Sequence, residues 1–308
     1  MVSFAQLAAG MPPPVHCADD AYRLGEPIDD QHGTLNSTDG TCLFYRYWPA
    51  TGAWSGHVAL VLHGIGYHSA PYKVIADSLN PRGVDVYALD ARGHGLSCGR
   101  RGYVGAPAQV AADVACMLQF IKKERPGANV FLLGDSMGSN YALNYARHGG
   151  NSLAGMVLLA PAFYVDKDQL FRMQSLREMP YLFLAHRKPV IDLVGERLSE
   201  STGDPHFALA RRADSLAYSK VSFGYILDIQ RLIWNWKGAI APRLRLPILM
   251  IKGGKDNVVS QTDCETFERL SASSDIRFQV YPEVRHTTLW DPQTPEILDQ
   301  VGSWILER

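Results

Sequence analysis

The sequence of 308 residues has almost no excess of either charge. Thirty Lys and Arg residues stand against thirty-one Asp and Glu residues, which leaves a formal net charge of −1. A surface without a strong field of one sign has no general attraction for nucleic acid or for an anionic membrane. The charge balance therefore gives no reason to expect nucleic acid as a partner.

The sequence is also poor in cysteine. Its five cysteines are odd in number, widely spaced and without a C-x-x-C pair. This pattern argues against a disulfide framework and against a zinc site, and it favours a reducing, cytoplasmic location. The five are Cys17, Cys42, Cys98, Cys116 and Cys264.

Long apolar runs are missing as well. No window approaches the roughly eighteen uninterrupted apolar residues that a transmembrane helix needs. Residues 1–10 lack a basic segment, and the apolar stretch they form stops at Pro12. We therefore expect neither a signal peptide nor an integral association with a membrane.

What the sequence does contain is a regular alternation of two patterns. With 46% hydrophobic and 20% charged residues it can bury a large core. Short apolar runs rich in β-branched residues alternate with segments of helical period, which predicts an α/β fold with a mostly parallel central sheet flanked by helices. The predicted strands are 42–48, 58–62, 84–89, 129–133, 156–160, 248–252 and 277–281, and the predicted helices are 110–123, 139–148, 261–270 and 295–306.

The alternation stops between residues 162 and 238. This stretch has no clear strand but many aromatic and aliphatic residues, among them the amphipathic segment 223–234. We interpret residues 162–238 as a helical insertion, named the cap below, in a core domain made of residues 1–161 and 239–308. Most of its apolar residues are expected simply to pack the cap onto the core.

One short motif has the sequence and the position expected of a catalytic serine. Residues 134–138 read Gly-Asp-Ser-Met-Gly, directly after an apolar run and directly before a helical pattern. This strand-turn-helix setting is the one that a nucleophile elbow requires, because the tight turn lifts the serine hydroxyl above the sheet. The motif predicts Ser136 as a nucleophile.

A serine hydroxyl is a weak nucleophile and needs a base that an acid holds in place. Asp256 and His286 follow Ser136 in the order expected, each just past the end of a predicted late strand. The carboxyl ends of parallel strands open on one edge of the sheet, so the three side chains are expected to converge. We predict a Ser136, His286 and Asp256 triad.

The intermediate of acyl transfer also needs hydrogen-bond donors for its oxyanion. The loop at residues 63–69 reads His-Gly-Ile-Gly-Tyr-His-Ser and follows the predicted strand 58–62. In this type of site one backbone N–H comes from that loop and another from the residue after the nucleophile. We therefore expect the N–H groups of Ile65 and Met137 to form the oxyanion hole.

No metal or cofactor is expected. His63, His68, Asp90 and His94 lie in two glycine-rich loops without the spacing of metal ligands. The triad needs no cofactor for its chemistry.

Taken together, five motifs in order resemble the monoacylglycerol lipase and lysophospholipase-like branch of the α/β hydrolases. The resemblance covers roughly residues 35–305, and residues 204–205 with 212–216 are similar to the family's cap pattern. The motifs are residues 63–69, residues 90–97 (Asp-Ala-Arg-Gly-His-Gly-Leu-Ser) followed by 99–104, residues 134–138, residues 253–256 and His286.

This resemblance implies hydrolysis of a small-molecule carboxylic ester with one long acyl chain, in lipid metabolism. Tyr67 and Pro71 depart from the family, which often has Glu and Arg there, so recognition of the alcohol is expected to differ. The walls of an apolar acyl pocket are expected from Phe183, Leu184, Tyr225 and Ile226 of the cap, with Tyr67 near the oxyanion loop.

Several questions stay open at this point. The same triad serves thioesterases and carbon–carbon bond hydrolases, and the fold also carries non-catalytic ligand-binding proteins. The sequence leaves the oligomeric state undecided, and it allows peripheral contact of the cap with a membrane.

Overall fold

A computed structural model describes residues 31–148, 152–163, 191–192 and 201–308. Its centre is an eight-stranded sheet with the order β1-β2-β4-β3-β5-β6-β9-β10. The six strands from β4 to β10 in that order run parallel, whereas β2 pairs antiparallel with both β1 and β4. The predicted α/β fold with a mostly parallel sheet is confirmed. The strands are β1 Gln31–Asn36, β2 Cys42–Trp48, β3 His57–Leu62, β4 Asp85–Leu89, β5 Asn129–Asp135, β6 Gly155–Leu159, β9 Ile248–Gly253 and β10 Ile276–Tyr281.

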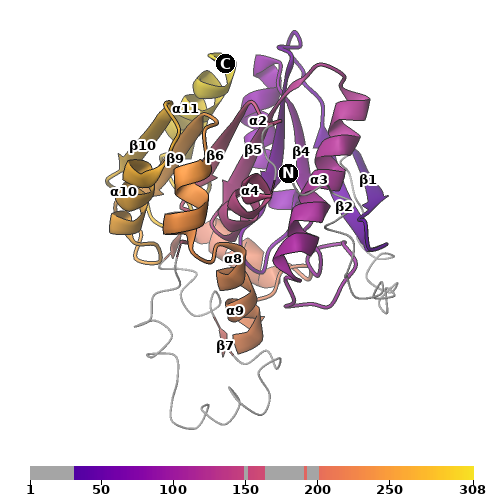
Figure 1. Ribbon diagram of the computed structural model, residues 1–308, viewed down its shortest axis with the longest axis vertical. Coiled ribbons are helices and arrows are strands. Elements are labelled where there is room, and N and C mark those ends of the chain that lie inside the picture. Colours follow the sequence, from indigo (N-terminus) through magenta and orange to yellow (C-terminus); the bar gives the residue numbers. More distant parts are fainter. Residues whose placement is uncertain (1–30, 149–151, 164–190, 193–200) are drawn as a thin grey trace.

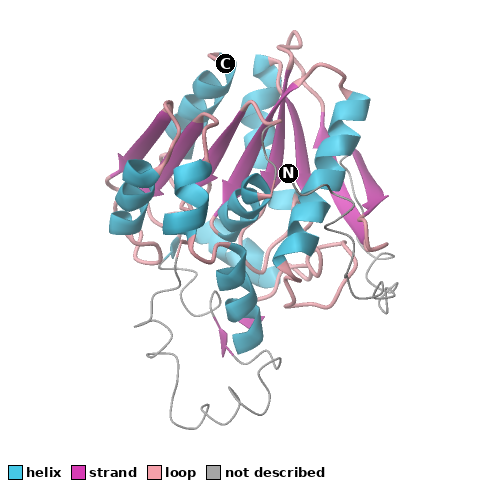
Figure 2. Cartoon of the chain, in the orientation of Figure 1, coloured by secondary structure: helices cyan, strands magenta, loops and turns pink. Residues whose placement is uncertain are grey.

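Helices cover both faces of the sheet (Figures 1 and 2). In β3, Val58, Leu60 and Leu62 belong to one hydrophobic cluster and Ala59 and Val61 to the other. Because strand side chains alternate between faces, a strand that is apolar throughout needs a cover on each side. Helices α3, α4 and α10 provide one cover, and α2 and α11 provide the other. The helices are α2 Lys73–Leu79, α3 Pro107–Glu124, α4 Met137–Arg147, α10 Gln261–Leu270 and α11 Thr294–Leu306, with single helical turns at Ala70–Tyr72, Asn80–Arg82, Trp236–Ile240 and Ala241–Arg243.

The predicted strands and helices of the core are all present, but two further elements were not predicted. Strand β1 lies at the edge of the sheet, its side chains are largely exposed, and it contains no apolar run that a pattern could detect. Helix α2 is seven residues long and follows the helical turn at Ala70–Tyr72, so it is too short to show a clear helical period.

Four described elements fall in the cap. Helices α8 Pro205–Ala213 and α9 Phe223–Leu232 each begin after a capping side chain, Asp204 and Ser222, that accepts a backbone N–H. Strands β7 Ile191–Asp192 and β8 Lys220–Val221 pair antiparallel, so the expectation that the cap lacks strands is wrong. Each strand has only two residues and leaves no pattern in the sequence. The cap elements lie at the end of the molecule away from the C-terminus (Figure 1), and the division into core and cap stays a prediction.

The cysteines differ from expectation at one position. Cys98 is disulfide-bonded, whereas Cys42, Cys116 and Cys264 carry free thiols. Burial raises the pKa of the Cys264 thiol to about 12, so that thiol stays protonated. The disulfide at Cys98 removes the support that cysteine usage gave to a reducing location, and the cytoplasmic location stays a prediction.

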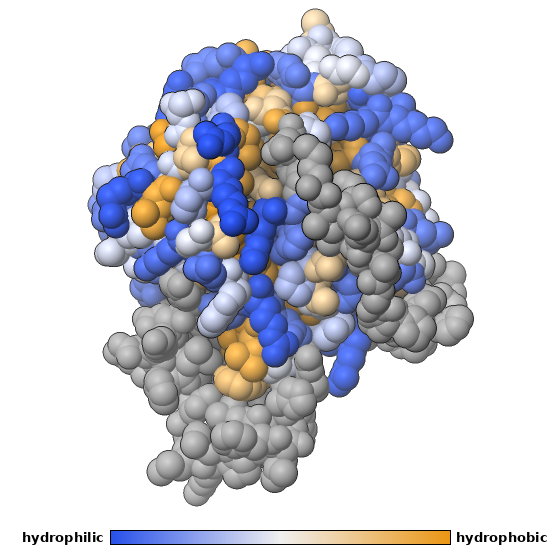
Figure 3. Space-filling model, viewed as in Figure 1, coloured by the Kyte–Doolittle hydropathy of each residue, from blue (hydrophilic) through white to orange (hydrophobic). Residues whose placement is uncertain are grey.

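Some apolar side chains reach the surface of the cap. Figure 3 shows hydrophobic residues at the surface over α9, where the side chain of Leu227 is 39% exposed. Leu209 of α8 and Trp234, just after α9, are also exposed. Across the described ranges, no helix has both the length and the apolar character needed to cross a membrane.

Candidate active site

Ser136 lies between the last residue of β5 and the first residue of α4. Its φ of 49° and ψ of −110° are outside the regions that L-residues ordinarily adopt. Such a conformation costs on the order of 1–3 kcal/mol and persists only where the surroundings enforce it. The strained turn that the motif predicts is therefore present at Ser136.

The two glycines of the motif allow backbones to pack directly against one another. A side chain at Gly138 would collide with the backbone of Leu62 at the end of β3. A side chain at Gly134 would come within 2.5 Å of the backbone nitrogen of Ser139. Larger residues would push α4 away from the sheet, so both glycines are needed to hold the serine at the sheet edge.

The structure brings the three predicted triad residues together. Ser136 Oγ lies 3.0 Å from His286 Nε2, and His286 Nδ1 lies 3.0 Å from Asp256 Oδ2. These residues follow β5, β10 and β9, whose carboxyl ends meet at one edge of the sheet. The contacts are the ones that a nucleophile, a base and an orienting acid require.

The carboxylate of Asp256 is itself held in place. Its Oδ1 accepts hydrogen bonds from the backbone N–H groups of Val258 at 2.8 Å and Val259 at 3.0 Å. The buried ammonium of Lys252 donates to the carbonyl oxygens of Gly253 and Asp256. With both carboxylate oxygens engaged, Asp256 has one orientation toward His286.

The electrostatics of the pair favour the charged forms. Burial disfavours the imidazolium of His286, but the charge and the hydrogen bond of Asp256 outweigh burial and raise the pKa of His286. Burial likewise opposes ionisation of Asp256, and its interaction with His286 outweighs burial and lowers the pKa of the carboxyl. The pair is thus suited to accept a proton at His286 while Asp256 stays ionised.

The predicted oxyanion residues lie on either side of the serine. Met137 is the first residue of α4, and Ile65 lies in the loop that follows β3. Within the described part of the chain, neither backbone N–H donates to a protein acceptor. Both groups are therefore available to a ligand, and their role as oxyanion donors stays a prediction.

A buried hydrogen-bonded chain, absent from the sequence-based prediction, links this loop to the elbow. The hydroxyl of Tyr72 donates to Asp135 Oδ2 at 2.5 Å and accepts from the N–H of Gly64 at 2.8 Å. Burial raises the pKa of Asp135, which is next to the serine. No spacing in the sequence indicates that Tyr72 would reach across 63 residues to this carboxyl.

Tyr67, one of the predicted substrate contacts, lies in an aromatic cluster. Its side chain is 3% exposed, and its ring meets those of Tyr72, Phe207 and Trp290 edge to face. The guanidinium carbon of Arg211 lies 4.4 Å from its ring centroid. Burial raises the pKa of Tyr67, so its hydroxyl stays protonated. Contact between Tyr67 and substrate stays a prediction.

The four predicted pocket walls divide into two pairs. Phe183 and Leu184 lie outside the described residues. Tyr225 and Ile226 lie on α9 and are 0% and 1% exposed. The hydroxyl of Tyr225 lies 3.1 Å from Met137 Sδ, which places α9 directly against the residue after the nucleophile.

The histidines near this edge have partners within the protein. His63 Nε2 lies 3.0 Å from the backbone nitrogen of Ala91, and His94 Nε2 lies 2.6 Å from the hydroxyl of Tyr218. His68 Nε2 lies 2.6 Å from Asp214 Oδ2. No group of three or more His, Cys, Asp or Glu side chains placed to hold a metal ion occurs in the described ranges.

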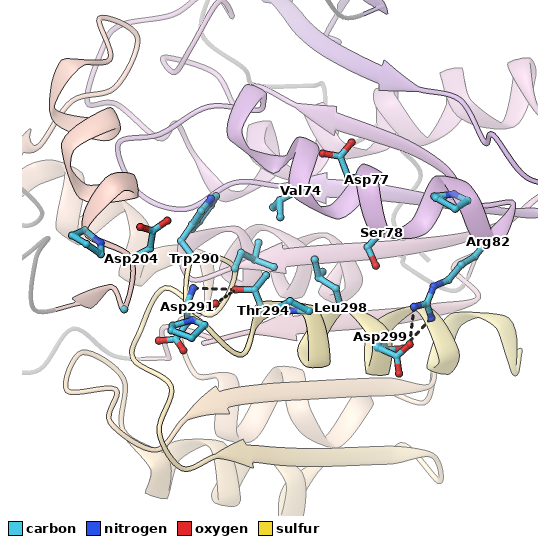
Figure 4. Close-up of a pocket in the computed structure, with 16 residues that line it drawn as sticks. Val74, Asp77, Ser78, Arg82, Asp204, Trp290, Asp291, Thr294, Leu298 and Asp299 are labelled. Carbon is cyan, nitrogen blue, oxygen red and sulfur yellow. Dashed lines mark hydrogen bonds and ion pairs between the residues drawn. The ribbon is translucent and has the colours of Figure 1, made fainter.

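A cavity of about 870 Å³ is lined by residues of 74–82, 203–205 and 289–299 and by none of the triad residues (Figure 4). Val74 and Leu298 line it from α2 and α11, and Trp290 forms a wall that stacks on Phe207 at 4.1 Å. Since Trp290 also packs against Tyr67, this cavity and the oxyanion loop share a wall. The sequence pattern did not predict this cavity.

A family model described as serine aminopeptidase, S33, matches residues 55–293, which include the triad and the loop that follows β3. Among curated proteins, the chain is 27% identical over 296 residues to a monoglyceride lipase of Homo sapiens, with 92% of both chains covered. It is also 27% identical over 270 residues to a monoacylglycerol lipase of Mycolicibacterium smegmatis, covering 87% of this chain and 94% of that protein.

Solved structures of similar fold include lipases. A soluble variant of monoglyceride lipase from Saccharomyces cerevisiae, in complex with a substrate analog, has a TM-score of 0.75 at 20% identity and covers 96% of this chain and 98% of its own. Monoacylglycerol lipase from Paleococcus ferrophilus has a TM-score of 0.72 at 20% identity, with 86% and 98% covered. At 20% identity, the similarity to these structures shows a shared fold and nothing about the reaction.

Proposed function

Because the chain belongs to the S33 serine aminopeptidase family of α/β hydrolases, we propose that it is a carboxylic ester hydrolase that works through an acyl-enzyme on Ser136. The observation that carries this proposal is the continuous chain from Ser136 Oγ through His286 to Asp256, with the serine on a strained turn. A nucleophile on a strained turn next to an oriented base is the arrangement that acyl transfer needs.

The steps follow from the contacts. Ser136 Oγ attacks the ester carbonyl carbon while His286 Nε2 takes the hydroxyl proton, and the N–H groups of Ile65 and Met137 stabilise the oxyanion. His286 then gives its proton to the alcohol that leaves. A water molecule that His286 deprotonates attacks the acyl-enzyme, and the acid is released as His286 returns the proton to Ser136 Oγ.

We propose a monoacyl ester, either a monoacylglycerol or a lysophospholipid, as the substrate class. Support comes from the relatives named monoglyceride or monoacylglycerol lipase, which match nearly the full length of the chain. Tyr225, whose hydroxyl lies 3.1 Å from Met137 Sδ, and its neighbour Ile226 are proposed as walls of the acyl pocket, together with Phe183 and Leu184. Exposed Leu227 on α9 would let the cap touch a lipid surface from which such a substrate is drawn.

Ser136 is tested directly by a fluorophosphonate probe, which forms an adduct with an activated serine. We expect one adduct, at Ser136 by peptide mass mapping, and none in Ser136→Ala. A protein that binds ligands without turnover would give no adduct, and so would a misassigned nucleophile. Circular dichroism of both proteins serves as the control for folding.

The substrate class is tested with a panel of acyl donors. It comprises p-nitrophenyl esters of increasing chain length, monoacylglycerols, lysophospholipids, acyl thioesters and aminoacyl anilides. We expect the highest kcat/KM on a long-chain monoacyl ester. Preference for the thioester would make the protein a thioesterase, and preference for the aminoacyl anilide would make it the peptidase that the family description names.

A further inference from the structure

The loop after β3 is hydrogen-bonded to the cap at consecutive backbone groups. Arg211 Nη2 of α8 donates to the carbonyl oxygen of Ile65 at 2.6 Å. The carbonyl oxygen of Gly66 accepts from the backbone N–H of Tyr218 at 2.8 Å. The consecutive carbonyl oxygens of Ile65 and Gly66 are therefore both held by hydrogen bonds from the cap.

The packing at Gly66 leaves the loop little freedom. Gly66 has a φ of +63°, and a side chain at this position would collide with the carbonyl oxygen of Tyr218. Only glycine fits both the backbone conformation and the space. Loop and cap thus meet backbone against backbone, and the loop cannot change its path unless the cap moves.

Tyr225 reaches the other predicted oxyanion residue. Its hydroxyl lies 3.1 Å from Met137 Sδ and 3.0 Å from His94 Nε2, and its side chain is fully buried. This buried hydroxyl therefore contacts the side chain of the residue after the nucleophile. Its neighbour Ile226 has no polar atom that could act in this way.

Arg211 is placed as a hydrogen-bond donor to the loop and makes no ion pair. No carboxylate lies within salt-bridge distance of it in the described part of the chain, and its guanidinium packs on the ring of Tyr67. Burial lowers the pKa of Arg211, so placing a cation here costs free energy. The rigid fork of a guanidinium and its stacking on an aromatic ring are properties that Lys would not reproduce.

We propose that Arg211 and Tyr225 are positioning residues for the two oxyanion donors, the backbone N–H groups of Ile65 and Met137. Arg211 fixes the peptide plane on one side of the Ile65 α carbon, and the N–H that is to donate lies on the other side of the same atom. Tyr225 holds the side chain of Met137, whose backbone N–H is the second donor. An oxyanion donor is effective only when it is 2.7–3.1 Å from the developing charge, a general requirement of such sites. This inference rests on the proposed esterase function.

The test compares Tyr225→Phe and Arg211→Gln with wild type on p-nitrophenyl butyrate, with active sites counted by fluorophosphonate labelling. Loss of one oxyanion donor typically costs about 100- to 1,000-fold in kcat, so a displaced donor should cost about 10- to 100-fold with little change in KM. Affinity for a trifluoromethyl ketone, which forms a tetrahedral adduct, should fall by the same factor. Affinity for an ether analogue of the ester should not change, and Arg211→Lys should recover part of kcat.

Two matched substitutions serve as controls. Tyr47→Phe removes a half-buried hydroxyl that is bonded to Asp85 at the start of β4, and Arg231→Gln removes a largely exposed guanidinium from α9. Both controls should keep the wild-type kcat. If the variants of Tyr225 and Arg211 keep kcat within twofold of wild type, or change KM alone, the positioning role is wrong. The proposed esterase function would still stand in that case, because wild type would still hydrolyse the ester. A wild type that hydrolyses no ester and takes no label would overturn both.

Discussion

The serine elbow and the oxyanion loop lie at the same edge of the sheet but are held in different ways. The elbow is fixed by β5, α4 and the close approach of Gly138 to the backbone of Leu62. The loop around Ile65 is fixed by side chains from the cap, about 150 residues further along the chain. The first region follows from chain topology, and the second depends on long-range side-chain contacts. This difference suggests that the sheet edge carries the chemistry and the cap adjusts its efficiency.

The largest effect is expected at the nucleophile. Removing one member of a serine-based triad lowers kcat by about 10⁴- to 10⁶-fold in well-studied hydrolases, so Ser136→Ala should fall in this range. Because Ala keeps the Cβ and α4 keeps its other contacts, the backbone strain stays and the melting temperature should stay close to that of wild type. Initial rates on p-nitrophenyl butyrate, with differential scanning calorimetry, measure both. Activity above a hundredth of wild type would contradict the role of the elbow.

A smaller but still severe loss is expected at Asp256. Asp256→Asn keeps the shape of the side chain but removes the charge that orients His286 and stabilises its imidazolium, which should lower kcat about 10⁴-fold. The exposed carboxylate of Asp77, paired with Lys73 on α2, offers a control, because Asp77→Asn should leave kcat unchanged. An equal loss in both variants would show that a general charge effect, and not the sheet edge, is responsible.

The two regions also differ in how far the sequence predicted them. Ser136, Asp256 and His286 each follow an apolar run, and the parallel sheet brings the ends of those three strands to one edge. Tyr72 and Arg211 follow no such rule, since their partners are set by how helices pack on the loop. Tyr225 was predicted as a pocket wall, and no spacing in the sequence indicates that its hydroxyl would contact Met137.

The pH dependence of kcat/KM tests the interaction between His286 and Asp256 at the sheet edge. His286 acts as a base only when it is neutral, and Asp256 raises its pKa above the ordinary value near 6.5. Activity should therefore fall as the pH drops through an apparent pKa higher than 6.5, because His286 becomes protonated there. A histidine without a carboxylate partner would still be neutral at that pH. Rates on an uncharged ester between pH 5 and 9 would measure this pKa, and kcat/KM should fall about tenfold per pH unit below it. A midpoint at or below 6.5 would mean that the pair is weaker than the contacts indicate.

The smallest effect is expected where the cap meets the loop through charge. His68 Nε2 and Asp214 Oδ2 are 2.6 Å apart, and Asp214 also accepts from the backbone N–H of Leu216. In Asp214→Asn the amide oxygen can keep the bond to Leu216, and the amide nitrogen then faces His68, so the charge and the acceptor for His68 are lost. Hydrogen bonds to charged groups contribute about 1.5–3 kcal/mol and partly exposed pairs less, which corresponds to a two- to tenfold fall in kcat/KM. Raising the salt concentration should reduce wild-type kcat/KM toward the variant's value while leaving the variant unchanged. A loss as large as that of Asp256→Asn would break the comparison, because the cap would then carry the chemistry as much as the sheet edge does.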